Sequence, residues 1–141
     1  MNLCGKNTDR ERQEPGRSPS AGRPVDLVHL ERQTLGNRSL ECEVLELFLS
    51  RSEIYLQRLK DADEDKAWSD AAHAIKGSAR GIGAWHVANS AQAAEALSGE
   101  TRAAGCHAVL DDLERVIGEA NNYIESLLSG ADRDASSNTA S

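Results

Sequence analysis

The stretch His73-Ala74-Ile75-Lys76-Gly77-Ser78-Ala79-Arg80-Gly81-Ile82-Gly83-Ala84 decides the fold, because it combines one apolar face with one open face. On a helix that turns about 100° per residue, its apolar side chains fall within about 60° of Trp68. His73 lies roughly 140° from Trp68 and therefore points away from that stripe. The apolar set is Trp68, Ala71, Ala72, Ile75, Ala79 and Ile82. The pattern predicts a helix that packs through one side and exposes a histidine on the other.

The residues nearest this histidine suit phosphate chemistry. Lys76 follows His73 by three positions, and Arg80 lies on the same side of the helix. Lysine binds phosphate as a point charge. Gly77 costs a helix about 0.5–1 kcal/mol relative to alanine, and its missing side chain lets another molecule approach the imidazole. We therefore predict that His73 accepts a phosphoryl group, with Lys76 and Arg80 balancing charge.

The same stretch resembles the signature of the histidine-containing phosphotransfer (HPt) domain. That signature reads His, any residue, aliphatic, Lys, Gly, two small residues, two unspecified residues, aliphatic, Gly and Ala. Every specified position from His73 to Ala84 matches. The resemblance continues more weakly through Val87, Ala88, Ala91, Ala94 and Glu95. It implies a four-helix bundle that carries phosphate on His73.

The resemblance also implies a role for Glu95. In such domains a Gln or Glu at this position forms a hydrogen bond with the second ring nitrogen of the histidine. That bond would hold the proton on Nδ1 and leave Nε2 as the nucleophile. Gln92, one turn earlier, is expected on the same face, and Ser78 and Ala79 are expected to be small for helix packing.

Helical periodicity recurs along the rest of the chain. All three prolines lie at positions 15, 19 and 24, before the first apolar run. We predict an all-α fold, an antiparallel up-down four-helix bundle with a short additional N-terminal helix. The expected helices run from Val25 to about Leu35, from Ser39 as N-cap to about Asp61, from Glu64 to Arg80, from Ala84 to Leu97 and from Thr101 to about Leu128.

Particular apolar positions are expected to build the core. Leu27, Val28, Leu30 and Leu35 should pack from the short helix, and Gly81 and Gly83 should make a tight corner around Ile82. In the next helix one stripe should comprise Leu40, Val44, Leu47, Phe48, Tyr55 and Leu59. The segments 1–24 and 129–141 are polar and are predicted to be disordered tails around one domain of residues 25–128.

Composition argues against several functions. The net charge of −7 disfavours nucleic acid. No apolar run reaches membrane-spanning length, and no secretory signal is visible, so we expect a cytoplasmic protein. Cys4, Cys42 and Cys106 lack metal-ligand spacing, and no paired histidine motif occurs. A Walker-type loop is also absent, so we expect neither a metal site nor phosphorylation directly from ATP.

The residues and the resemblance together predict a phosphorelay intermediate rather than an enzyme. His73 would accept a phosphoryl group from a receiver-domain aspartate and pass it to another receiver aspartate. The expected partners are response-regulator receivers or a hybrid histidine kinase, with the receiver supplying Mg²⁺ and this chain, a monomer, needing no cofactor. The receiver should dock beside Ile82, Trp85 and the first two helices.

Two alternatives remain open at the level of sequence. The first is a helical adaptor or inhibitor that binds a receiver or a kinase without carrying phosphate. The second is a structural bundle that dimerises through its last helix, which would need neither Gly77 nor an exposed His73.

Overall fold

The computed structural model describes residues 23–140, with side chains up to residue 130. The predicted tail of residues 1–24 therefore lies almost entirely outside the described residues. Five helices occupy the described part of the chain. They are α1 (Leu27–Thr34), α2 (Arg38–Asp61), α3 (Asp65–Ile82), α4 (Trp85–Glu95) and α5 (Gly99–Ala140).

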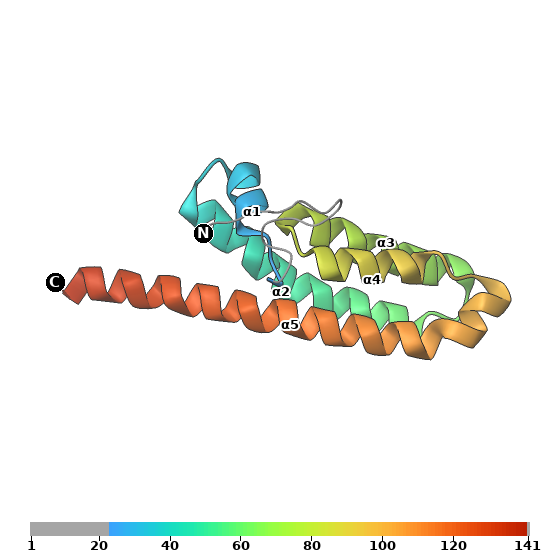
Figure 1. The fold of residues 1–141 in the computed structure, drawn as a ribbon. Coiled ribbons are helices and arrows are strands. Elements are labelled where there is room, and N and C mark those ends of the chain that lie inside the picture. Colours follow the sequence, from blue (N-terminus) through green and yellow to red (C-terminus); the bar gives the residue numbers. More distant parts are fainter. Residues whose placement is uncertain (1–22, 141) are drawn as a thin grey trace, which may run out of the picture.

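The four long helices run alternately up and down, and each packs against two others (Figure 1). The order around the bundle is α2, α3, α4 and α5, with α5 closing back onto α2. The short connections enforce this antiparallel arrangement. Helix α1 lies across one end of the bundle, against α2 and α3. The predicted all-α up-down bundle with a short leading helix is confirmed.

Helix α2 begins with a different capping residue from the one that we predicted. The N-cap of α2 is Asn37, whose Oδ1 accepts the Leu40 amide at 3.0 Å. Ser39, which we predicted to be the cap, is instead the second residue of the helix. Asparagine two residues earlier is an equally favoured capping residue, and its side chain satisfies an otherwise unbonded amide of the first turn.

The corner after α3 is made by one glycine rather than two. Gly81 is helical, and α3 continues to Ile82. Gly83 ends the helix with φ +78°, in the left-handed region that glycine adopts without steric cost. Helix α4 stops at Glu95, two residues before the predicted end, and α5 begins at Gly99 rather than at Thr101.

Helix α5 is longer than predicted. The sequence predicts an end near Leu128 and a disordered tail over residues 129–141, but the helix extends to Ala140. Extending an existing helix requires no new nucleation, and no proline interrupts this segment. In Figure 1 the extension projects beyond the other long helices. The domain boundary at residue 128 stays a prediction.

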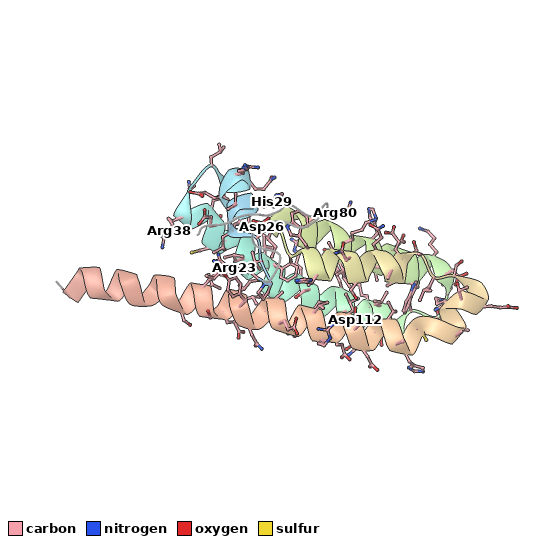
Figure 2. The ribbon with its side chains drawn as sticks, in the orientation of Figure 1. Arg23, Asp26, His29, Arg38, Arg80 and Asp112 are labelled. Carbon is pink, nitrogen blue, oxygen red and sulfur yellow. The ribbon has the colours of Figure 1, made fainter. Side chains whose placement is uncertain are left out.

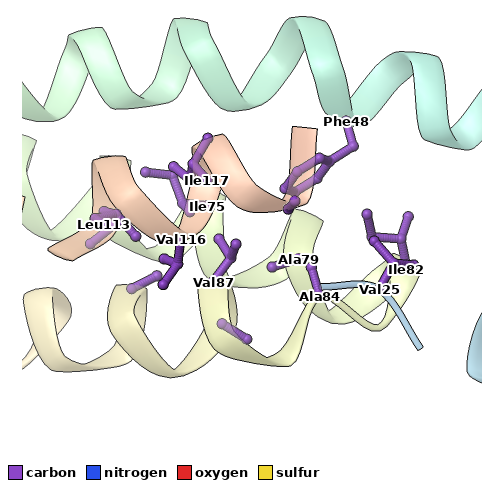
Figure 3. Close-up of a cluster of buried hydrophobic side chains, with 14 of the residues drawn as sticks. Val25, Phe48, Ile75, Ala79, Ile82, Ala84, Val87, Leu113, Val116 and Ile117 are labelled. Atoms are coloured by element: carbon purple, nitrogen blue, oxygen red, sulfur yellow. The ribbon is translucent and has the colours of Figure 1, made fainter. Parts of the chain in front are cut away.

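The core is built from aliphatic residues and many alanines (Figure 3). The side chain of Trp68 is 2 % exposed, and Ile75 on the same face of α3 is fully buried. All six residues of the predicted α3 stripe are buried. Alanines on α3 and α4 let the two backbones approach closely, so this pair of helices forms the most extensive contact in the bundle.

Some leucines expected in the core are exposed. Leu47 is 46 % exposed and Leu40 is 40 % exposed, whereas Leu45, Phe48, Ser52 and Leu59 form the buried side of α2. Leu47 lies roughly 130° around the helix from the centre of that buried set. The predicted stripe is therefore wrongly centred. In the short helix, Val28 is 53 % exposed and Leu35 is 91 % exposed, so these two predictions are also wrong.

Helix α1 is fastened to the corner between α3 and α4. Asp26 caps α1 by accepting the His29 amide, and it also accepts the indole N–H of Trp85 at 3.0 Å. The His29 ring lies edge-on to Trp85 and its Nε2 contacts the Arg80 carbonyl at 2.9 Å. Figure 2 shows Asp26, His29 and Arg80 together at this end. Trp85 therefore helps to hold α1, and the docking of a receiver beside it stays a prediction.

Gly83 is the residue on which this corner depends. A Cβ placed there would lie 2.8 Å from the Asp26 Cβ, at a positive φ. We expect Gly83→Ala to lower the free energy of unfolding by at least about 1–2 kcal/mol, from the left-handed backbone alone. Urea unfolding followed by circular dichroism measures this change.

The matched control is Gly77→Ala, inside the helix that Gly83 ends. A Cβ at Gly77 meets no atom within 4 Å, so alanine should raise the free energy of unfolding by about 0.5–1 kcal/mol. A Gly83→Ala protein as stable as the wild type would contradict the proposed role of this corner.

Candidate functional site

His73 projects from the middle of α3 into solvent. Its side chain is 69 % exposed, while the opposite face of the same helix is buried in the core. The sequence predicted this orientation from helical periodicity, and the structure agrees. An exposed imidazole on a rigid, well-packed helix can be reached by a second protein without any rearrangement of the bundle.

Glu95 from α4 lies against the second ring nitrogen. Its Oε2 is 3.1 Å from His73 Nδ1. A carboxylate oxygen only accepts, so in the neutral imidazole this contact favours the tautomer with its proton on Nδ1 and its free lone pair on Nε2. The contact that the family resemblance implied is thus present, and it joins two side chains that are 22 residues apart in the chain.

A buried hydrogen bond sets the position of Glu95. The indole N–H of Trp68 on α3 donates to the carbonyl of Ala94 at 2.7 Å. Ala94 immediately precedes Glu95, so this bond fixes the end of α4 relative to α3. The register of the two helices, and with it the distance between His73 and Glu95, follows from this contact.

Lys76 differs from the mobile ammonium that we expected beside the ring. Its side chain is only 16 % exposed, and its Nζ lies 2.6 Å from Glu95 Oε1. Glu95 therefore holds Lys76 with one oxygen and His73 with the other. The bond from Lys76 is the main cause that lowers the pKa of the Glu95 carboxyl, and the His73 contact lowers that pKa further against the opposing effect of burial.

The other residues predicted for the site also lie around this face. Gly77 leaves open space one turn from His73, since a Cβ there would meet nothing within 4 Å. The guanidinium of Arg80 donates to Gln92 Oε1 at 3.2 Å, which places this cation toward α4. The structure thus connects His73, Lys76 and Glu95 by direct contacts, and it places Gly77 and Arg80 beside them.

One feature of the site was missed from the sequence. A pocket of about 220 Å³ opens between α2 and α3, beside Gly77. We missed this pocket because we assigned Leu47 to the core. The spacing of Leu40, Leu47 and Ile54 at intervals of seven could have indicated a second apolar stripe, on the exposed side of α2. We call it the α2/α3 pocket. It is lined by Val44, Leu47, Phe48, Arg51, Gly77, Ser78, Gly81 and Ile82.

The described residues contain neither a candidate metal site nor a candidate membrane-spanning helix. Among them, no group of three or more His, Cys, Asp or Glu side chains is arranged to hold a metal ion. Within the same part of the chain, no helix combines the length and the apolar character needed to cross a membrane.

Comparison with known families agrees with this geometry. Residues 43–129 match the family described as the Hpt domain, and the match includes His73, Lys76, Gly77 and Glu95. It covers more than half of the chain. Neither a curated protein nor a solved structure matches the chain.

The contact between Glu95 and His73 predicts a preferred tautomer. We expect long-range ¹H–¹⁵N NMR spectra at alkaline pH to show the His73 proton mainly on Nδ1. Glu95→Ala should remove this preference because it removes the acceptor. Glu95→Gln, which keeps one acceptor oxygen, should retain part of it. An unchanged tautomer ratio in Glu95→Ala would show that the contact does not orient the ring.

The lowered pKa of Glu95 predicts a pH-dependent contribution to stability. Because the folded-state pKa lies below the ordinary value of 4.5, ionised Glu95 stabilises the fold fully above that value. The contribution is lost as the pH falls through the folded-state pKa. Urea unfolding from pH 7 to pH 3 should therefore show a stability advantage over Glu95→Gln that shrinks on acidification.

Comparing the wild type with Glu95→Gln isolates the contribution of Glu95 to stability from those of other acidic groups. Asp65 and Asp112 also have lowered pKa values, from bonds to Gly99 and Arg102 and to Ser90 and Arg115 respectively. Both remain in Glu95→Gln, so their effects cancel in the difference. An advantage that stays constant down to pH 3 would contradict the assignment.

Proposed function

Because this chain belongs to the Hpt domain family, whose members carry phosphoryl groups on histidine in phosphorelays, we propose that His73 is the residue that is phosphorylated. The observation that supports this proposal most directly is the His73–Glu95 contact, which in the neutral ring favours a proton on Nδ1 and a free lone pair on Nε2, on a side chain that is 69 % exposed. The proposed donor and acceptor are aspartates of receiver domains, one before and one after this protein in the relay.

The proposed transfer needs no proton to leave the ring. The Nε2 lone pair attacks phosphorus in line, the bond between phosphorus and the aspartyl oxygen breaks, and the receiver regains its carboxylate. The ring then bears phosphate on Nε2 and the proton on Nδ1, and it carries a positive charge. The reverse sequence, with a second aspartate as nucleophile, empties the histidine.

Glu95 suits both stages of this cycle. Before transfer its carboxylate orients the neutral imidazole, and after transfer it lies 3.1 Å from a ring nitrogen that carries positive charge. Lys76 keeps this carboxylate ionised and held in place through the 2.6 Å ion pair. We therefore propose that Lys76 acts as a positioning residue through Glu95, while Arg80 adds positive charge at the edge of the face.

The receiver would bring the remaining chemistry. A receiver active site is expected to supply Mg²⁺, which neutralises charge on the phosphoryl oxygens. This chain contributes the nucleophile, its orientation and an uncrowded surface at Gly77. Proximity and alignment account for most of the expected rate, because phosphoryl transfer of this kind requires little further covalent assistance.

A transfer assay tests the proposal. The purified protein is incubated with phosphorylated receiver domains, taken from the genome that encodes it, in the presence of Mg²⁺. We expect label on the wild type that is labile to acid and stable to base, as for phosphohistidine. His73→Gln removes the nucleophile but keeps a polar side chain of similar size, so it should fold normally and accept no label.

The control and the contrary results separate the candidate functions. His86→Gln removes a different exposed histidine and should leave labelling unchanged. Equal labelling of His73→Gln and the wild type would show that another residue carries phosphate. Tight binding of a receiver without any labelling of the wild type would favour an adaptor instead.

A further inference from the structure

A second pocket opens on the side of the bundle away from His73. Helices α2 and α5 run beside each other there (Figure 1), and their contact is the least extensive among the four neighbouring pairs of long helices. The space between them has a volume of about 290 Å³, and neither His73 nor Glu95 lines it. We call it the α2/α5 pocket. Its walls include Glu53, Leu56 and Lys60 of α2 and Glu114, Gly118 and Asn121 of α5.

The floor of this pocket is apolar and is open at a glycine. Leu56 and Ile117 line it from the two helices, and a Cβ at Gly118 would meet no atom within 4 Å. Packing inside this protein therefore does not require glycine at position 118, although glycine is unfavourable in the interior of a helix. Without a side chain there, the apolar walls leave room for an unbranched aliphatic chain.

The charges around this floor differ between its two ends. At one end the Lys60 ammonium forms an ion pair with the Glu114 carboxylate, so the two charges offset each other. Glu53 lies seven positions before Lys60, which is about 10 Å along a helix. Glu53 is exposed, and among residues 23–130 it takes part in no ion pair. The Glu53 end of the pocket is therefore negative and attracts a cation.

Asn121 lies near the same end and has an unused acceptor. Its Nδ2 donates to the Ser52 hydroxyl at 3.4 Å, whereas its Oδ1 is buried and accepts no hydrogen bond from the described residues. Ser52 donates its own proton to the Leu49 carbonyl and so can only accept from Asn121, which assigns the amide nitrogen to the Ser52 side. A buried carbonyl oxygen without a donor is unfavourable. Because one long hydrogen bond holds this amide, turning its oxygen toward a donor in the pocket costs little.

These features favour an ammonium group on an aliphatic chain over other cations. The chain would replace water over the apolar floor. The three N–H donors of an ammonium point in different directions, so they can reach acceptors on two different helices. A guanidinium presents its donors in one plane, which suits the two oxygens of a single carboxylate better.

We propose that the α2/α5 pocket binds a primary ammonium group carried on an aliphatic chain. The nitrogen lies between the Glu53 carboxylate and a turned Asn121 Oδ1, and the chain lies against Leu56 and Gly118. Two sources offer this chemistry, a free alkylamine and a lysine side chain of another protein. A chain of net charge −7 attracts both. The site is separate from His73, so this inference does not depend on the proposed phosphocarrier function.

An NMR titration tests the proposal. ¹H–¹⁵N spectra of the full chain are recorded at pH 7 and constant ionic strength with butane-1,4-diamine, and separately with Nα-acetyl-lysine N-methylamide. Both probes are cationic at this pH. We expect saturable shifts of the Asn121 side-chain amide and the Gly118 backbone amide. 1-Butanol, which has the chain without the charge, should bind at least about tenfold more weakly.

The two amine probes distinguish the sources of the ammonium group. Tighter binding of the diamine would assign the pocket to a free alkylamine. Tighter binding of the lysine derivative would assign it to a lysine of a partner protein. Either result supports an ammonium site, and failure of both probes to give saturable shifts would overturn it.

A pair of charge variants separates the proposed contact from general attraction. Glu53→Gln should raise the Kd of the probes at least about tenfold, because it removes the charged acceptor. Glu46→Gln is the matched control, since Glu46 is also exposed on α2, seven positions earlier, and does not line the pocket. It removes the same charge and should change the Kd by less than about twofold.

Two further variants test the space and the amide. Gly118→Leu fills the pocket and Asn121→Leu removes the second acceptor, so each should raise the Kd at least about tenfold. Gly81→Leu is the matched control for the first variant, since Gly81 is a helical glycine of α3 that also has open space at its Cβ. Urea unfolding should show that Gly118→Leu is at least as stable as the wild type, which separates loss of binding from loss of the fold.

Several results would overturn the proposal. Shifts that stay linear in probe concentration and spread over all exposed carboxylates would show non-specific attraction only. Equal weakening by Glu53→Gln and Glu46→Gln, or unchanged binding by both Gly118→Leu and Asn121→Leu, would also overturn it. His73→Gln should bind the probes like the wild type, so a failed phosphotransfer assay leaves this test unaffected.

Discussion

The hydrogen bond between the Trp68 indole and the Ala94 carbonyl is the contact on which the geometry of the site depends. It is buried, so leaving either group unpaired would cost more than a surface hydrogen bond. It joins the largest side chain on the buried face of α3 to the residue before Glu95. Because α3 and α4 cannot slide without breaking it, their register is fixed where the imidazole and the carboxylate meet.

The charges at the site form a short chain rather than a set of free ions. Lys76 holds one oxygen of Glu95, and the other oxygen faces His73. Most of the lysine side chain is covered, so its position costs little further entropy when a partner arrives. The arrangement gives an exposed nucleophile a fixed orientation through a Lys76–Glu95 pair that is itself mostly covered.

Glycines have two opposite uses in this fold. At Gly83 the backbone itself requires glycine, since the positive φ and the contact with Asp26 exclude a side chain. At Gly77 and Gly81 the bundle would accept a side chain, and the helix would be more stable with one. The first kind of glycine serves folding, and the second leaves open space on the surface of α3.

Helical periodicity along α3 by itself determined much of this protein. It separated Trp68 and Ile75 from His73, and short polar connections made the bundle antiparallel, because both properties depend only on local geometry. Periodicity placed Leu47 and Leu35 wrongly, since several leucines compete for one buried face and only neighbouring helices decide which of them is covered. Likewise, the pairing of Lys76 with Glu95, the fastening of α1 through Asp26 and Trp85, and the α2/α3 pocket were decided by tertiary structure. Each joins residues from different helices, whose rotation and register follow from packing rather than from the spacing of residues along one helix.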